Sequence, residues 1–493
     1  MTEYKQFLAS KVLRAHSTGI EPGDMPDAMK PHQCDATIMA IRRGRSGLFL
    51  DTGLGKTFCE LEFAAQAADA TNGRALILTP LAVAKQIERE SGRFHYNAKV
   101  IREQRDVCDG INICNYDRLE KLAPEAFGAI VLDESSIMKS FTGKTTRALI
   151  EAFGGHRFRL AATATPAPND HMELGNHSEF LGVMTVQEML SRFFINDTST
   201  ASQEWRLKGH AETAFYDWMA SWACMAESPA DFGYDGSEYV LPELQIIRHQ
   251  GHAGIAAING DGLFASDISA TNMFAVKRAT CVARAKLVAD IVFTSLGADQ
   301  ASCQTSGLDF SEKTPRTLLG LSHTSKIQRP QSWVLWCDTN DEQLALEREF
   351  GTIAISITGS QSPEEKEELH DAWLFGERPV LITKSAILGY GVNWQHCSHM
   401  CFVGRNFSYE SWYQAVRRCW RFGQKRPVRV HLAVAEGEDQ IGRVIDRKSD
   451  DHSKMKRAMA VAMRRALGRE HKTRIAYDPS HIGRLPSWLQ SAV

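Results

Sequence analysis

The chain has 493 residues and a formal net charge of −2, a length that suits two or three ordinary domains. Lys and Arg number 57 against 59 Asp and Glu, which excludes a protein that binds nucleic acid through overall positive charge. Hydrophobic residues make up 43%, so a mostly disordered chain is also excluded.

There is no apolar run of the roughly 18 residues that a membrane span needs. The first ten residues lack the apolar core of a secretion signal, and the 11 cysteines include no C-x-x-C pair. We therefore expect a protein of the reducing cytoplasm without a membrane partner.

Short apolar runs alternate with amphipathic helical patterns in two stretches, at about 30–190 and 285–440. Runs that are apolar throughout are typical of strands buried on both faces, in parallel sheets covered by helices. In the first stretch these runs are residues 47–52, 74–80, 111–116 and 129–134; in the second they are 332–338, 352–359, 379–384, 399–404 and 428–434. The fold class predicted is therefore α/β, with two parallel-sheet units.

Three other segments have a different composition. Phe215, Trp218, Met219 and Trp222 recur at helical spacing, which favours a helix with an aromatic face packed into a core over a platform for stacking bases. Residues 296–331 are rich in Ser, Thr, Gly and Gln and read as a surface insertion. From Cys401 onward, 19 Lys and Arg stand against nine Asp and Glu. A charge run of this kind is more often a solvated helical face than a binding site, and both interpretations stay open.

A glycine-rich loop follows the first apolar run. It consists of Asp51, Thr52, Gly53, Leu54, Gly55, Lys56 and Thr57, and a helical pattern comes after it. Glycines let backbone N–H groups wrap around phosphate oxygens, while Lys56 would reach the β- and γ-phosphates of ATP and the Thr57 hydroxyl would hold Mg²⁺. The strict G-x-x-x-x-G-K-[ST] pattern fails because its first glycine falls on Leu50, and Gly53 supplies the flexibility instead.

Two carboxylates end the run at 129–134. Asp133 lies 77 residues after Lys56, a spacing that fits one RecA-like nucleotide-binding domain. Asp133 would hold the Mg²⁺, and Glu134 would orient and deprotonate the attacking water. Each motif alone is weak evidence, but together they predict an ATP-hydrolysing site.

Further motifs occur in the order found in superfamily II helicase-like ATPases of the Swi/Snf branch, in the compact form met in phages and prophages, and the chain resembles this family over about residues 28–450. The matching segments are residues 31–33 with Gln33, 78–81 with Thr79, 115–116 with Asn115, 133–136, 163–166 with Thr163 and Thr165 and Asn169 beyond them, 389–393 with Gly391, and 414–424 with Gln414, Arg418 and Arg421. The last segment, Q-A-V-R-R-C-W-R-F-G-Q, is the most specific one.

The resemblance implies a role for each of these residues. Gln33, Gly391 and Gln414 join the glycine-rich loop as ATP-binding residues, and Thr163 with Thr165 couples hydrolysis to movement. Thr79, Asn115 and Ser385 are the expected nucleic-acid contacts. For each of these three, a plain structural role, such as capping a helix, is an equally good interpretation.

Arg418 and Arg421 lie three residues apart and share one face of a helix. From the second unit they would reach across a cleft to the γ-phosphate and neutralise charge in the transition state. Hydrolysis would then depend on closure of the two units.

Some positions depart from the family pattern. The Asp that precedes the first arginine in relatives is Arg417 here, and Ser135-Ser136 stands in place of Ala-His. The replacement by Ser135-Ser136 leaves open how the ATP site is connected to residues 163–165.

The complete prediction is two RecA-like parallel-sheet domains in tandem, with a helical insertion between them and a basic helical C-terminal tail. The expected boundaries are 1–190 for the first domain, 191–284 for the helical linker, 285–450 for the second domain and 451–493 for the tail. The expected activity is ATP hydrolysis with ATP and Mg²⁺, coupled to translocation on double-stranded DNA.

Three alternatives remain open. One is a strand-separating DNA or RNA helicase, and another is the motor subunit of a larger restriction or defence complex. The third is a scaffold that does not hydrolyse ATP, although Lys56, Asp133, Glu134 and both arginines are intact. No base-reading module is apparent, so a protein partner would supply any sequence specificity. The expected location is cytoplasmic and nucleoid-associated, in a bacterial or phage-infected cell.

Overall fold

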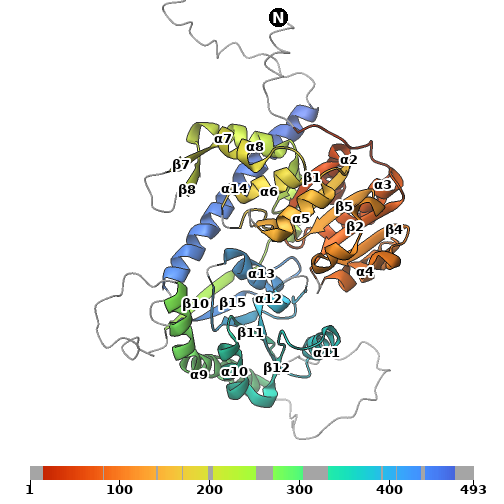
Figure 1. The fold of residues 1–493 in the computed structure, drawn as a ribbon. Coiled ribbons are helices and arrows are strands. Elements are labelled where there is room, and N and C mark those ends of the chain that lie inside the picture. Colours follow the sequence, from red (N-terminus) through yellow and green to blue (C-terminus); the bar gives the residue numbers. More distant parts are fainter. Residues whose placement is uncertain are drawn as a thin grey trace, which may run out of the picture.

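The computed structural model describes residues 15–80, 83–139, 143–168, 170–197, 204–250, 270–303, 331–389, 392–406, 408–434 and 439–471. Within these ranges the chain forms two parallel sheets of seven and six strands and one two-stranded ribbon (Figure 1). The predicted fold class, two α/β units in tandem, is confirmed.

The first sheet has the strand order β3-β4-β2-β5-β6-β1-β9, and every pair in it is parallel. Its strands are β1 (Arg45–Leu50), β2 (Arg74–Thr79), β3 (Ala98–Val100), β4 (Gly110–Asn115), β5 (Ala129–Asp133), β6 (Phe158–Ala162) and β9 (Ala223–Ala226). All apolar runs predicted in the first stretch are strands of this sheet.

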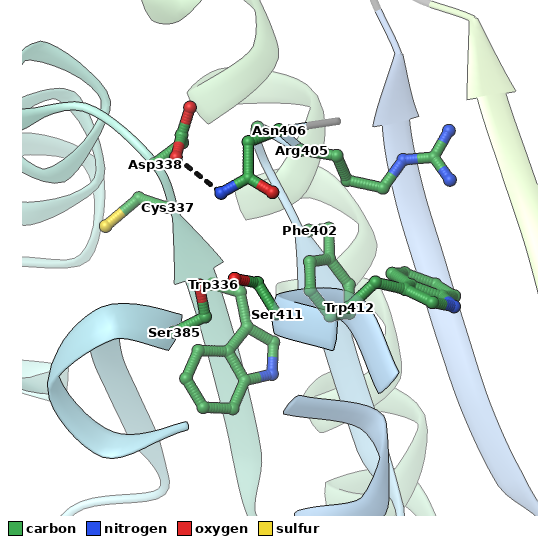
Figure 2. Close-up of a pocket in the computed structure, with 10 residues that line it drawn as sticks. Trp336, Cys337, Asp338, Ser385, Phe402, Arg405, Asn406, Ser411 and Trp412 are labelled. Atoms are coloured by element: carbon green, nitrogen blue, oxygen red, sulfur yellow. Dashed lines mark hydrogen bonds between the residues drawn. The ribbon is translucent and has the colours of Figure 1, made fainter. Parts of the chain in front are cut away.

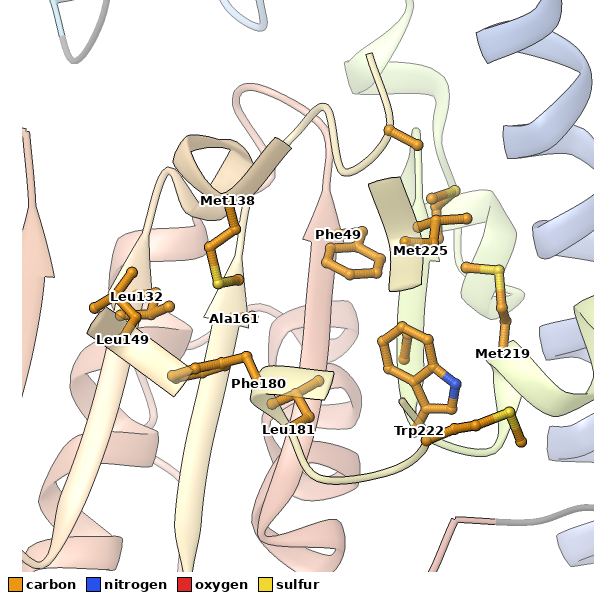
Figure 3. Close-up of a cluster of buried hydrophobic side chains, with 14 of the residues drawn as sticks. Phe49, Leu132, Met138, Leu149, Ala161, Phe180, Leu181, Met219, Trp222 and Met225 are labelled. Atoms are coloured by element: carbon orange, nitrogen blue, oxygen red, sulfur yellow. The ribbon is translucent and has the colours of Figure 1, made fainter. Parts of the chain in front are cut away.

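Alternate side chains of each strand enter two separate cores, which is why helices cover both faces. Leu48 and Leu50 pack against α2 (Pro31–Arg43), α3 (Lys56–Asp69) and α4 (Ala84–Arg93). Phe49 and Leu132 point to the other face, toward Phe180 and Trp222 (Figure 3). That face is covered by α5 (Lys144–Phe153), α6 (Glu173–Phe180), α7 (Val186–Phe193) and α8 (Glu212–Ala220).

The second sheet has the strand order β10-β15-β14-β11-β13-β12, again parallel throughout. Its strands are β10 (Leu244–Gln250), β11 (Trp333–Cys337), β12 (Ala354–Ser356), β13 (Val380–Lys384), β14 (His399–Phe402) and β15 (Val428–Val434). The helices of this unit are α9 (Ala270–Cys303), α10 (Asn340–Phe350), α11 (Pro363–Leu374), α12 (Ser385–Leu388) and α13 (Tyr409–Cys419). Thr339 and Ser362 cap α10 and α11 by accepting backbone N–H groups three residues on.

The segment expected as a helical linker, 191–284, contributes to both units. Its first part forms the ribbon of β7 (Phe194–Asp197) and β8 (Glu204–Leu207), then α8 and β9 of the first unit. Its last part provides β10, which pairs with β15 in the second sheet. The expected aromatic helix is α8, and Phe215, Trp218 and Met219 are at most 2% exposed, as core packing predicts.

The basic end of the chain is also part of a folded unit. Helix α14 (Asp439–His471) leaves the second sheet and runs back along the first unit, where it contacts α8 and β9 (Figure 1). Met455, Met459 and Ala462 enter one core of the first unit and Met463 enters the other. Arg464 and Arg465 pair with Asp231 and Asp217 at 3.2 and 2.9 Å. Residues 472–493 and most of the expected insertion, 304–330, lie outside the described residues.

Candidate active site

The glycine-rich loop connects β1 to α3, at the carboxyl edge of the first sheet. Gly53 and Gly55 have φ angles of 95° and 82°, a region that side-chain-bearing residues rarely adopt. A Cβ on Gly55 would lie 2.0 Å from Gln33 Nε2, so a side chain there would displace the Gln33 amide as well as strain the backbone. Gln33 Nε2 donates to the Leu54 carbonyl at 3.0 Å. The predicted ATP-binding residue Gln33 therefore contacts the loop directly.

Lys56 and Thr57 are the first two residues of α3, whose free N–H groups face the loop. Lys56 Nζ donates to the Leu50 carbonyl at 3.0 Å, so its side chain lies back across the loop. Thr57 is partly exposed. With Gln33, the loop thus brings together the groups that a polyphosphate requires: backbone N–H donors, a lysine and a hydroxyl.

Asp133 and Glu134 stand at the end of β5, beside β2. Asp133 is 7% exposed and accepts a hydrogen bond from Thr79 Oγ1 at 2.8 Å. Burial, together with the neighbouring Glu134 charge, raises the pKa of Asp133 above its ordinary value. Glu134 has a φ of 51°, an uncommon conformation for a non-glycine residue, and such conformations cluster at functional sites.

Thr163 and Thr165 follow β6 at the same edge of the sheet. Thr163 Oγ1 lies 3.4 Å from Glu134 Oε2, and the Thr165 N–H donates to Thr163 Oγ1 at 3.2 Å. A chain of hydrogen bonds therefore leads from residues 163–165 to Glu134. Asn169 lies outside the described residues.

Ser135, which departs from the family pattern, does not take part in the hydrogen bonds between residues 163–165 and Glu134. Its Oγ lies 3.1 Å from Nε2 of His177 on α6, and both residues are buried. Burial lowers the pKa of His177 to about 4, so the imidazole is neutral at pH 7. The contact of Thr163 with Glu134 thus exists without the histidine that relatives carry.

The two predicted arginines of α13 and its C-terminal end lie inside the second unit. Arg418 donates to the carbonyl and to Oε1 of Gln414 at 2.9 and 2.6 Å, and to the Val392 carbonyl at 3.1 Å. Arg421 also donates to the Val392 carbonyl, at 3.3 Å. Burial and the neighbouring Arg418 lower the pKa of Arg421 to about 10. These hydrogen bonds of both arginines go to groups of the second unit, and Gly391 lies outside the described residues.

Arg417 reaches the loop in their place. Its Nη2 lies 3.0 Å from Asp51 Oδ1 and 3.1 Å from the Thr52 carbonyl. The sequence offered a signal for this contact, because Arg417 stands where relatives have an aspartate. Phe422 also touches the loop, since a Cβ on Gly53 would lie 2.7 Å from Phe422 Cβ.

A cavity of about 390 Å³ lies between the loop and the second unit. Asp51, Thr52 and Leu54 form one side of it, α13 forms another, and Lys456 with other residues of α14 forms a third. Tyr239 and Phe422 stack at its edge with ring centroids 4.3 Å apart, and Lys30 Nζ lies 4.9 Å from the Tyr239 ring centroid.

The predicted nucleic-acid contacts have other neighbours in this structure. The Thr79 side chain is fully buried against Asp133, and Asn115 Oδ1 accepts the Asp117 N–H at 3.3 Å as the cap of a short 3₁₀ helix. Ser385 begins α12 and lines a cavity of only about 10 Å³, room for about one water (Figure 2). Asp338 there accepts from Asn406 at 3.3 Å. A role of these three residues in nucleic-acid binding stays a prediction.

The oxygen ligands offered by the loop and by the end of β5 suit Mg²⁺, a hard cation that binds one or two carboxylates together with phosphate oxygens. Thr57 and Asp133 are the predicted ligands. Glu60, one helical turn after Lys56, is fully buried, and both of its carboxylate oxygens lack a hydrogen-bond partner among the described residues. No group of three His, Cys, Asp or Glu in the described part of the chain is arranged to hold a metal ion. No described helix has the length and apolar character to cross a bilayer.

Residues 315–423 match the family of helicase conserved C-terminal domains. This segment is helicase-like. The matched segment covers β11 to α13 of the second unit, including the predicted segment 414–423, so the resemblance drawn from the motifs is confirmed there. No curated protein matches the chain.

Among solved structures, the chain is similar to the SWI2/SNF2 ATPase core of Sulfolobus solfataricus in complex with dsDNA. The similarity covers 90% of this chain and 95% of that one, with 17% identity and a TM-score of 0.39. A likeness at this level transfers no residue roles and no activity.

Proposed function

We propose that the chain is a Swi/Snf-type motor that hydrolyses ATP and uses the energy to move along double-stranded DNA. The observation that carries the proposal is the meeting of Lys56, Thr57, Asp133 and Glu134 at one edge of the first sheet. Residues 315–423, which match helicase C-terminal domains, lie in the second unit, and Arg417 among them contacts the loop. The spacing of Gln414, Arg418, Arg421, Gly423 and Gln424 is the feature that favours the Swi/Snf branch.

In this proposal the first unit binds the nucleotide and prepares the water. The loop N–H groups and Lys56 hold the phosphates, while Thr57 and Asp133 bind Mg²⁺, which when present neutralises charge on the phosphate oxygens. Glu134 orients the attacking water and accepts its proton. Thr163 holds the Glu134 carboxylate in place through its hydroxyl.

Arg418 and Arg421 are proposed to act on the γ-phosphate after a rearrangement of the second unit. Both now bond to the Val392 carbonyl, beside the predicted ATP-binding segment that contains Gly391. Movement of that segment would break the bond that each guanidinium group makes to Val392, while Arg418 would keep its bonds to Gln414. Such arginines contribute roughly 10³–10⁵ in rate in related phosphoryl-transfer enzymes.

We choose double-stranded DNA as the substrate because of the amino-acid sequence of residues 414–424. The second candidate is a strand-separating helicase that acts on DNA or RNA. Phosphate contacts would supply affinity without sequence specificity, so a protein partner would select the site of action. Membership in a larger restriction or defence complex is compatible with both candidates.

The test is steady-state ATP hydrolysis with no nucleic acid, with duplex DNA, with single-stranded DNA and with RNA, at one salt concentration. Strong stimulation by duplex DNA is expected. Stimulation by single strands alone would favour the helicase, and stimulation by RNA alone would overturn the choice of substrate. A folded protein that binds ATP and never hydrolyses it would contradict the proposal.

A further inference from the structure

A buried ionic cluster joins Asp51, the first residue of the phosphate loop, to helix α14. Asp51 Oδ1 accepts hydrogen bonds from the Tyr413 hydroxyl at 2.5 Å and the Thr52 N–H at 2.6 Å, and it lies 3.0 Å from Arg417 Nη2. Asp51 Oδ2 lies 3.3 Å from Lys456 Nζ. The side chains of Asp51, Arg417 and Lys456 are only 5–8% exposed.

Lys456 has no role in the motif pattern, yet it has several partners. Besides Asp51, its ammonium lies 3.2 Å from the Tyr413 hydroxyl and 3.3 Å from Glu227 Oε1. The same Nζ stands 5.1 Å from the centroid of the Tyr413 ring. Each partner comes from a different element: the phosphate loop, α13 and the segment after β9. Lys456 is thus the point at which α14 meets both units.

Because these charged side chains are buried, each of them needs a partner of opposite charge. A buried cation without its counter-charge is strongly unfavourable, so Lys456 and Arg417 both need the Asp51 carboxylate. Conversely, although burial alone would raise the pKa of Asp51, the two cations hold it below its ordinary value. The carboxylate stays ionised at all pH values near neutrality and is pulled toward α13 and α14.

Asp51 is the residue at which β1 becomes the phosphate loop. Its Oδ1 accepts the N–H of the next residue, and Arg417 also bonds the next carbonyl. Both backbone polar groups of Thr52 are thereby bound by side chains, while the loop itself contains two glycines in left-handed conformations. Such a loop has little intrinsic stiffness, so its position depends on these contacts.

We propose that Lys456 is a positioning residue for ATP binding, which fixes the start of the phosphate loop through Asp51 and makes helix α14 a component of the nucleotide site. This proposal rests on the assignment of the loop to ATP. It adds a function for the C-terminal helix that the motifs do not contain. It also explains why Arg417 replaces the aspartate of relatives, because an aspartate there would face Asp51 in a buried site.

The test compares ATP affinity in the full-length chain, measured with a fluorescent ATP analogue. Lys456→Met keeps the length of the side chain and removes the charge, and about a tenfold loss of affinity is expected. Lys456→Arg should restore affinity to within about threefold of wild type. Lys454→Met is the matched control, because Lys454 lies on the same helix and is 70% exposed. It should bind as wild type does.

A double-mutant cycle separates positioning from general destabilisation. Asp51→Asn removes the charge that Lys456 holds, so adding Lys456→Met to it should cost less than twofold more. Equal, additive losses would overturn the proposal, and so would a Lys456→Met variant that binds ATP within twofold of wild type. Thermal unfolding shows whether each variant is folded, and Lys456→Gln, judged by the same criteria, replaces the methionine variant if that one is not.

The readout is binding, so the outcome is independent of turnover. If the wild-type chain binds ATP without hydrolysing it, and Lys456→Met weakens binding, only the proposed motor function fails. If wild type hydrolyses ATP on DNA and the variant does so with an unchanged KM, only the role of Lys456 fails.

Discussion

The Thr163 hydroxyl lies 3.4 Å from Glu134 Oε2, the carboxylate proposed to activate water. The two residues come from neighbouring strands, β6 and β5, and meet only because both strands end at the same edge of the sheet. A displacement of residues 163–165 therefore moves the carboxylate. This geometry gives a direct physical route from those residues to the rate of hydrolysis.

Thr163→Val keeps the shape of the side chain and removes the hydroxyl. Hydrogen bonds to charged groups contribute about 1.5–3 kcal/mol, so kcat should fall about tenfold or more with little change in KM. Thr163→Ser, which keeps the hydroxyl, is the control. A valine variant with full kcat would show that Glu134 is held by other groups.

Lys56→Ala should abolish ATP turnover, because the loop then lacks the cation that meets the β- and γ-phosphates. DNA binding, measured by fluorescence anisotropy, should be largely retained. Lys99→Ala is a suitable control, since Lys99 is exposed on β3, the edge strand of the first sheet. Unchanged turnover in Lys56→Ala would remove the loop from the mechanism.

Glu134→Gln should bind ATP and fail to hydrolyse it, because the amide cannot accept the proton of the attacking water. Single-turnover measurements with radiolabelled ATP should recover intact nucleotide from the complex. Release of ADP at the wild-type rate would exclude Glu134 as the base.

Arg417 and Arg421 should differ in the kinetic constant that each affects. Arg421→Ala should lower kcat far more than ATP affinity, as expected for a group that acts in the transition state. Arg417→Ala should lower affinity first, because Arg417 already contacts the loop in this structure. If both variants lose kcat and affinity in the same proportion, neither role is supported.

Glu60 gives a prediction about pH. Burial, reinforced by Asp133, raises the pKa of Glu60 well above its ordinary value. A carboxyl group with a higher pKa in the folded than in the unfolded state binds more protons when folded. The free energy of unfolding therefore falls as pH rises above about 4.3, the unfolded value.

Glu60→Gln removes that contribution, so the variant should gain stability relative to wild type between pH 5 and pH 8. Thermal melts without nucleotide measure the difference, and the exposed Glu125→Gln serves as control. A difference that does not change with pH would show that Glu60 is not the titrating group.

Much of the fold could be predicted because the strands and helices follow local patterns of apolar residues in the sequence. The apolar runs, such as 74–80 and 129–134, became strands, and the aromatic spacing of α8 became core. The loop, Asp133, Glu134 and Thr163 came together because parallel strands place their carboxyl ends at one edge.

The remaining features depend on tertiary contacts that no local pattern records. Strand β9 is four residues long and joins the first sheet only through its pairing with β1. Helix α14 reads as a charged surface helix, yet Met455 and Met459 on its other face fill a core more than 200 residues away in sequence. Arg417 was visible as a departure, but its partner Asp51 was not, because the pair bridges two units.

The path of the chain has a consequence for how the protein is made. The second sheet, from β10 to β15, lies in sequence between β9 and α14, which both belong to the first unit. The whole second sheet thus lies in sequence between two elements that pack together. During synthesis from the N-terminus, α8 and β9 cannot be covered by α14 until the whole second sheet has been made. A cut between the two sheets would therefore separate α14 from the first-unit elements that it covers.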